Sequence, residues 1–290
     1  MADTQLAGRV VVITGANIGI GRAVAEDLAA QGARLRLLCR SLAKAAPVVE
    51  ALKHRAGHDD VVAIACDLGQ LASVRAAAAA LLARDEPLHL LINNAGIGGQ
   101  RGLTADGFEL HFGTNHLGHF ALTQALLPRL RASAPARIVH VASGTHRQAP
   151  GISWDALRQP TPSVSGMAEY AVSKLANVLY SAELARRLAS TEVTSYAVNP
   201  GRVASNIWQR IPWPVRALFK LTMITTEQGA RSTLHAALSP DVVSGCYYGK
   251  RSTEEAVSAA ARDAALAAEL WARSEAWVAS PLVSEVCTHG

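Results

Sequence analysis

Short apolar runs alternate along the chain with longer stretches in which apolar residues recur every three or four positions. The short runs are typical of parallel strands buried on both faces, and the longer stretches have the period of amphipathic helices. We expect strands at 9–14, 34–39, 61–65, 88–93, 137–142 and 194–198, and an edge strand at 245–248. We expect helices at 20–31, 42–55, 71–84, 113–131, 167–188, 226–238 and 254–279, with a short helical turn near Thr104.

Regular alternation of strands and helices predicts an α/β fold with helices on both faces of a parallel sheet. Right-handed crossovers then give a Rossmann-like, doubly wound sheet of about seven strands, in a single domain over residues 1–290. We expect a cofactor half at about 8–142 and a catalytic and substrate half at about 143–290. Because ligands of such sheets bind beyond the carboxyl ends of the strands, the segments after each strand are the candidates for function.

Composition narrows the class of protein. Half of the residues are hydrophobic and 18% are charged, which predicts a large core and excludes a disordered chain. The net charge of +5 is spread along the chain without a basic run, so a phosphate-rich cofactor is favoured over nucleic acid.

The cysteines and the hydropathy pattern bear on the compartment. The four cysteines are far apart in sequence and form no CxxC pair, so we expect reduced thiols and no metal site. No signal peptide precedes the first strand, and no apolar run reaches the roughly 18–20 residues of a membrane-spanning helix. We therefore expect a soluble, cytoplasmic protein.

A glycine-rich turn, TGANIGIG at 14–21, follows the first strand. Glycines permit a tight turn and a close approach of the backbone to a pyrophosphate, which the next helix stabilises with its free N–H groups. A flexible surface turn is the alternative, but the order of strand, glycines and helix favours a dinucleotide site. The expected contacts here are Gly15, Asn17, Ile18, Gly19, Ile20 and Gly21.

The end of the second strand decides which dinucleotide is expected. NAD-binding sites usually place a carboxylate there for the ribose 2′-hydroxyl, whereas this chain has Cys39, Arg40 and Ser41. Arg40 can pair with a 2′-phosphate, and Arg22 could add a second positive charge. Unless both are solvated surface arginines, the sequence favours NADP(H).

Further motifs follow the later strands or lie on the helices after them. They are NNAG at 93–96, Asn115, Ser143, YAVSK at 170–174 and Asn199-Pro200-Gly201. With the glycine-rich turn, they resemble the short-chain dehydrogenase/reductase family over about residues 8–280. The segments FGTNHLGHFALT at 112–123 and YAVSKLANVLYSAELARRL at 170–188 are most similar to its retinol dehydrogenase and WW-domain oxidoreductase branch.

The resemblance implies hydride transfer between a nicotinamide and a carbonyl or alcohol carbon. Tyr170 would donate or accept the proton, and Lys174, on the same helical face, would lower the tyrosine's pKa from its usual value near ~10. Ser143 would hold the substrate oxygen. Asn115 would hold a water that links Lys174 to solvent, and Lys174 would also bind the nicotinamide ribose.

By the same resemblance, other residues contact the cofactor: Asp67, Leu68, Asn94, Ala95, Gly96, Pro200, Gly201 and Val203. Plainer interpretations also stand, with Ser143 as a turn former, Asn115 as an ordinary helix residue and Asp67 as a helix N-cap. We interpret His116 and His119 as packing or hydrogen-bonding groups, since no third metal ligand is near them in sequence.

Substrate recognition is expected in the apolar and aromatic segment 202–225, which includes Trp208. This segment could be a lid over a bulky lipophilic substrate, a membrane contact, or a core or subunit contact; the lid is favoured. The insert 144–166 is expected to form the opposite wall, with Trp154 lining it.

The sequence thus predicts an NADP(H)-dependent oxidoreductase, acting as a ketone or aldehyde reductase on a lipophilic substrate. The alternatives are an NADP(H)-binding sensor or scaffold without turnover, and a retinol or retinal dehydrogenase. The retinoid reading is less favoured because no apolar anchor precedes the first strand. By resemblance the helices at 113–131 and 167–188 could form a homodimer interface, unless the C-terminal segment covers them and the protein is a monomer.

Overall fold

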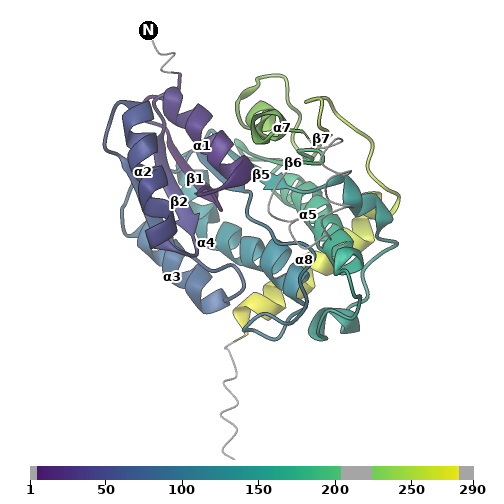
Figure 1. Ribbon diagram of the computed structural model, residues 1–290. Coiled ribbons are helices and arrows are strands. Elements are labelled where there is room, and N and C mark those ends of the chain that lie inside the picture. Colours follow the sequence, from purple (N-terminus) through teal and green to yellow (C-terminus); the bar gives the residue numbers. More distant parts are fainter. Residues whose placement is uncertain (1–4, 204–223, 281–290) are drawn as a thin grey trace, which may run out of the picture.

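Seven parallel strands form one sheet at the centre of the computed structural model, which describes residues 5–203 and 224–280 (Figure 1). The strands are β1 Val10–Thr14, β2 Arg34–Cys39, β3 Val61–Ala65, β4 Leu90–Asn93, β5 Ala136–Val141, β6 Val193–Val198 and β7 Tyr247–Tyr248. Their order is β3-β2-β1-β4-β5-β6-β7. The chain reverses its direction of growth between β1 and β4, and a ligand crevice is expected at that point.

Helices cover both faces of the sheet, which confirms the predicted fold class. They are α1 Gly19–Ala30, α2 Leu42–Ala56, α3 Leu71–Leu82, α4 Gly118–Ala132, α5 Met167–Arg187, α7 Thr226–Leu238 and α8 Ala264–Ala279. One face packs on α1, α2 and α7, and the other on α3, α4 and α5. None of the described helices is long and apolar enough to cross a membrane.

The first turn of the long helix expected at 113–131 is not an α-helix. Phe112–Leu117 forms a π-helix, and α4 follows it from Gly118. Insertions of this kind widen the helical turn and are frequent at functional sites. This one contains Asn115, so the wider turn lies at a predicted catalytic residue.

The helical turn expected near Thr104 is wrong, and the helix expected at 254–279 is confirmed only from Ala264 onward. Around Thr104 the chain forms turns closed by an antiparallel bridge between Leu103 and Glu109. The helix expected at 254–279 starts only at Ala264, because Glu254 forms an antiparallel bridge with Tyr248 of β7. After a 3-10 turn at Ala260–Arg262, the Asp263 side chain caps α8 by accepting hydrogen bonds from the first-turn N–H groups.

Helix α8 packs across α4 and α5, on the outer side of that layer (Figure 1). The ring of Trp271 lies 5.3 Å from Phe120 and 5.6 Å from Tyr180, measured between ring centroids. His116 and Ser274 are 3.1 Å apart between ring nitrogen and hydroxyl. The C-terminal segment therefore covers the helix pair that the sequence offered as a dimer interface.

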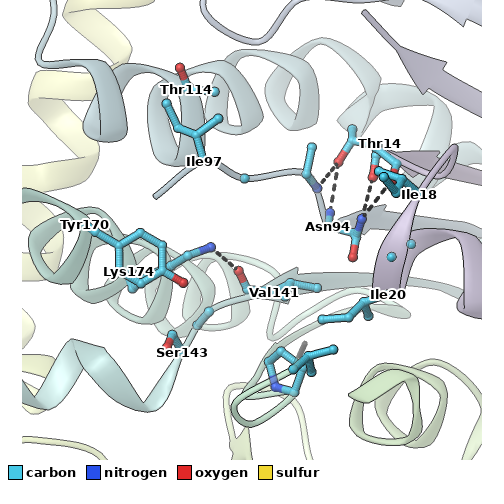
Figure 2. Close-up of a pocket in the computed structure, with 18 of the residues that line it drawn as sticks. Thr14, Ile18, Ile20, Asn94, Ile97, Thr114, Val141, Ser143, Tyr170 and Lys174 are labelled. Atoms are coloured by element: carbon cyan, nitrogen blue, oxygen red, sulfur yellow. Dashed lines mark hydrogen bonds between the residues drawn. The ribbon is translucent and has the colours of Figure 1, made fainter. Parts of the chain in front are cut away.

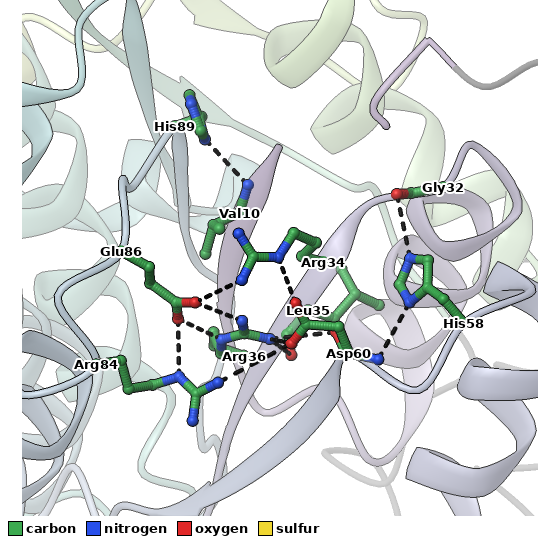
Figure 3. Close-up of polar contacts among 10 residues, drawn as sticks. All are labelled: Val10, Gly32, Arg34, Leu35, Arg36, His58, Asp60, Arg84, Glu86 and His89. Atoms are coloured by element: carbon green, nitrogen blue, oxygen red, sulfur yellow. Dashed lines mark hydrogen bonds and ion pairs between the residues drawn. The ribbon is translucent and has the colours of Figure 1, made fainter. Parts of the chain in front are cut away.

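An ionic cluster joins β2 to the segments before β3 and β4 (Figure 3). Arg36 is fully buried and donates to both carboxylate oxygens of Glu86, at 2.5 and 2.6 Å. It also pairs with Asp60, and Arg34 and Arg84 contact the same two carboxylates. Because a buried guanidinium is costly unless it is paired, these contacts fix how the segments meet at the amino end of the sheet.

Candidate active site

A cleft of about 1340 Å³ runs along the carboxyl ends of the strands. Its volume exceeds the usual range for a pocket that holds one small ligand, so a dinucleotide and a substrate fit together. Most of the predicted site residues line it: Gly15, Asn17, Ile18, Gly19, Ile20, Gly21, Arg40, Asp67, Leu68, Asn94, Ala95, Gly96, Ser143, Tyr170, Lys174, Pro200, Gly201 and Val203.

The glycine-rich turn leaves room and donors for a diphosphate. Gly15 and Gly19 both have left-handed backbones, with φ of +68° and +61°. A Cβ at Gly15 would meet Ala95 at 2.9 Å, whereas a Cβ at Gly19 would meet nothing within 4 Å. Helix α1 starts at Gly19, and no side chain of its N-cap residue, Ile18, occupies the first-turn N–H groups. These groups fit a nicotinamide dinucleotide, since free helix N–H groups and the helix dipole bind phosphate.

A hydrogen-bonded clamp fixes this turn to the segment after β4 (Figure 2). The Thr14 hydroxyl accepts the backbone N–H groups of Asn94 and Ala95, both at 2.9 Å. In return the Asn94 side-chain amide donates to the Thr14 carbonyl at 2.8 Å. The two segments that line the cofactor end of the cleft are therefore positioned by each other.

The end of the cleft after β2 is cationic. Arg40, Ser41 and Lys44 line it, and the segment 38–44 contains no carboxylate. Lys44 was not predicted from the sequence, although it follows Arg40 by only four residues. Arg22 does not line the cleft and pairs with Glu26 at 2.8 Å, so it is not the second cation.

Asp67 lines the cleft and stabilises a turn within its own loop. Its carboxylate accepts the N–H of Gly69 at 2.9 Å. Gln70 is the N-cap of α3, so the alternative of a helix cap at Asp67 is wrong.

Ser143, Tyr170 and Lys174 meet on one side of the cleft (Figure 2). Ser143 lies two residues after the end of β5, and the other two lie one turn apart on α5. The Ser143 hydroxyl donates to the Thr145 hydroxyl at 3.0 Å. The Lys174 ammonium donates to the carbonyl of Val141 at 2.9 Å and lies 5.6 Å from the centre of the Tyr170 ring.

Burial dominates the electrostatics of this group. It raises the pKa of Tyr170, and the polar Ser143 side chain opposes that rise only in part. Burial also lowers the pKa of Lys174 to about 8. The net shift of the Tyr170 pKa is therefore upward, opposite to the sequence expectation, because burial of the phenol outweighs the effect of the Lys174 ammonium 5.6 Å from the ring centre.

Asn115 lies behind this group and does not line the cleft. Its side-chain oxygen accepts the N–H of Ile97 at 2.8 Å, and its amide donates to the Ile97 carbonyl and to Ser173 on α5. Ser173 in turn donates to the Tyr170 carbonyl at 2.8 Å. Asn115 thus joins the π-helix to the turn of α5 that carries the tyrosine, and it is not an ordinary surface helix residue.

The substrate end of the cleft differs from the expectation. Met167, Gln148, Ile224 and Glu255 line it, whereas Trp154 does not. The indole of Trp154 lies under the Arg273 guanidinium at 4.7 Å and near Trp277, because α8 offers a cation and an aromatic ring there. Trp208 and most of the 202–225 segment lie outside the described residues.

Other residues of the cleft lining were not predicted. Thr14, Ile97 and Thr114 line it, and so does Lys250, which follows β7. Asn199 also lines the cleft, and its side-chain oxygen accepts the N–H of Gly201, which fixes the Pro200-Gly201 turn. Asn199 was quoted only as part of a motif, and Lys250 has no local sequence signal because its position depends on the edge strand.

Comparisons with known proteins place these motifs in context. Residues 9–213 match the short chain dehydrogenase family. The chain is 42% identical to human retinol dehydrogenase 11 over 93% of its own length and 86% of that protein. It is also 42% identical to dehydrogenase/reductase SDR family member 13 of Bos taurus, over 93% of this chain and 73% of that one. A crystal structure of an uncharacterised protein from Mycobacterium paratuberculosis superposes with a TM-score of 0.78 at 35% identity, covering 97% of this chain and 98% of the other.

Proposed function

This chain belongs to the short-chain dehydrogenase/reductase family, and on that premise we propose that it is an NADP(H)-dependent reductase of bulky lipophilic ketones or aldehydes. The family places it among oxidoreductases that act on alcohol or carbonyl groups with a nicotinamide cofactor. The observation that carries the proposal is the meeting of Ser143, Tyr170 and Lys174 in the same cleft as the glycine-rich turn. The cytoplasmic location expected from the sequence remains part of the proposal.

Proton transfer at the substrate oxygen is assigned to Tyr170. A bound nicotinamide supplies the hydride for reduction. The Ser143 hydroxyl orients and polarises the substrate oxygen, and the Tyr170 hydroxyl gives it a proton as charge develops there. With its pKa raised by burial, Tyr170 is protonated near neutral pH, as a proton donor has to be. Lys174 stabilises the phenolate that remains, since its ammonium lies beside the same ring.

The cationic end of the cleft supports the choice of NADP(H). A 2′-phosphate carries negative charge that Arg40 and Lys44 can pair with, and Ser41 can donate a hydrogen bond. An adenosine ribose without the 2′-phosphate would give Arg40 and Lys44 no anionic partner.

A retinoid is the second candidate substrate. The 42% identity to human retinol dehydrogenase 11, over nearly the whole chain, favours it. The described lining combines the apolar Met167 and Ile224 with Gln148 and Glu255, which admits a long apolar molecule with a polar end.

The proposal is tested by following NADPH oxidation against a panel of bulky aryl ketones, aliphatic aldehydes and retinal. We expect turnover with at least one lipophilic carbonyl and preference for NADPH over NADH. Tight NADPH binding, measured by fluorescence, without turnover of any panel member would favour a sensor or scaffold. A preference for retinal over every other carbonyl would select the second candidate.

Replacing Arg40 with Asp should move cofactor preference towards NAD(H). The change removes a charge-assisted bond to the 2′-phosphate and adds repulsion, so we expect the ratio of kcat/KM for NADPH to that for NADH to fall by about 10²-fold. The measurement is steady-state kinetics with both cofactors on one carbonyl substrate.

Arg22→Gln is the matched control for that change, because Arg22 lies after the same glycine-rich turn but pairs with Glu26. It should leave the cofactor ratio within about twofold, as expected for loss of an exposed ion pair. An unchanged ratio in Arg40→Asp would remove Arg40 from the 2′-phosphate site.

A further inference from the structure

A buried histidine, His119, bridges the cofactor end and the catalytic end of the cleft without lining it. One ring nitrogen, Nδ1, lies 2.9 Å from the carbonyl oxygen of Asn115. The other, Nε2, lies 2.9 Å from the hydroxyl of Thr14. Both contacts are within hydrogen-bonding distance, and both ring nitrogens are therefore used.

The chemistry of the two partners fixes the proton on the ring. The Asn115 carbonyl can only accept, so Nδ1 carries the hydrogen and donates it. A neutral ring then has a bare Nε2, which at 2.9 Å is a much closer acceptor for the single hydrogen of the Thr14 hydroxyl than the Ile92 carbonyl at 3.5 Å. The Thr14 oxygen remains free to accept, as it does from the N–H groups of Asn94 and Ala95.

The surroundings favour this neutral ring. Burial lowers the pKa of His119 to about 4; the bond to the Asn115 carbonyl raises it, and the nearby Lys174 charge lowers it further. Burial also lowers the pKa values of His116 and His140, to about 3.

The two ends of the His119 bridge are linked to two different regions of the site, the cofactor-binding turn and the turn of α5 that carries Tyr170. The Thr14 hydroxyl holds the segment after β4 against the glycine-rich turn. Asn115 is bonded through Ser173 to the turn of α5 that carries Tyr170. A Cβ at Gly96 would lie 3.3 Å from the Asn115 side-chain oxygen and 3.4 Å from the Lys174 nitrogen. The segment after β4 and the catalytic residues therefore approach each other closely at Gly96.

We propose that His119 is a positioning residue that couples the cofactor turn to the catalytic turn of α5 through a fixed Nδ1–H tautomer. The π-helix makes this geometry available because its wider turn carries Asn115 just before α4, which carries the ring. The inference rests on the proposed function only for its effect on turnover; the bridge itself is a property of the folded chain.

The tautomer is tested directly in the unaltered protein. In ¹⁵N-labelled protein, the His119 ring signals, assigned by their loss in His119→Gln, should show a protonated Nδ1 and a bare Nε2 that persist from pH 6 to 8. A protonated Nε2, or an exchanging mixture of tautomers, would overturn the bridge. Because this measurement needs neither cofactor nor substrate, it holds even if no substrate is found.

Two matched variants separate the two halves of the bridge. The side-chain amide of Asn can take over the hydrogen bond that Nδ1 makes to Asn115, and the side-chain amide of Gln can take over the hydrogen bond of Nε2 to Thr14. His119→Asn should weaken NADPH binding about five- to tenfold with kcat within about twofold, because it keeps only the Asn115 contact. His119→Gln should lower kcat by about tenfold with the Kd for NADPH within about twofold, because it keeps only the Thr14 contact.

His116→Gln is the control for a purely structural effect, because His116 is buried nearby but contacts Ser274 on α8. It should lower the free energy of unfolding, and it should not change one of the two quantities, the Kd for NADPH and kcat, while leaving the other unchanged. Equal changes in both quantities for His119→Asn and His119→Gln, or no change in either, would overturn the coupling. A wild-type protein without turnover would refute the proposed function, and the tautomer and the NADPH Kd would then decide the inference alone.

Discussion

Replacing Tyr170 with Phe should lower kcat by about 10²- to 10⁴-fold, the usual worth of a positioned general acid. Phenylalanine keeps the ring, which is 92% buried on α5, and removes only the hydroxyl group. The proton source is therefore lost while the packing is retained. The measurement is single-turnover NADPH oxidation with saturating substrate, which isolates the chemical step.

The Kd for NADPH and the thermal unfolding midpoint serve as controls for this variant. Both should stay close to those of the wild type, because a single hydroxyl at the cleft surface contributes about 1 kcal/mol to stability. A kcat within threefold of wild type would show that another group protonates the substrate oxygen and would refute the proposed mechanism.

Replacing Gly21 with Ala should destabilise the protein by about 3 kcal/mol, the upper end for overpacking a tight site. The new methyl would lie 2.3 Å from the side-chain nitrogen of Asn94 and 2.6 Å from the backbone oxygen of Gly15. The backbone oxygen cannot move without opening the turn that precedes α1. Denaturant unfolding of the cofactor-free protein measures the loss.

Gly19→Ala is the matched control, because a methyl there meets nothing within 4 Å in the cofactor-free protein. Its left-handed φ of +61° should cost only about 1–2 kcal/mol. The methyl should instead obstruct the phosphates, so NADPH binding should fall far more than stability does. Equal destabilisation by the two variants would mean that the turn tolerates both methyl groups in the same way.

The parts of the site that the sequence predicted are those whose chemistry is local. The glycine-rich turn requires small residues at fixed spacing next to a strand, and Tyr170 and Lys174 share a face because they are four residues apart. Arg40 directly follows its strand. In each case neighbouring residues carry the whole signal, so no long-range contact had to be inferred.

The parts that the sequence missed depend on contacts across the fold. The partners of Arg36 come from before β3 and before β4, far away in the chain. Trp154 turns to α8 rather than to the cleft, because Arg273 and Trp277 lie there. The lowered pKa of Lys174 comes from burial, which no spacing of residues reveals.

The covering of α4 and α5 by α8 also has a consequence for protein synthesis. The aromatic face that includes Phe120 and Tyr180 is complete once α5 has left the ribosome, but Trp271 emerges more than eighty residues later. At the ordinary pace of translation of about 5–20 residues per second, that face stays uncovered for several seconds. The nascent chain therefore exposes this aromatic face until the last described helix is made, when the residues of the cofactor turn have already been translated.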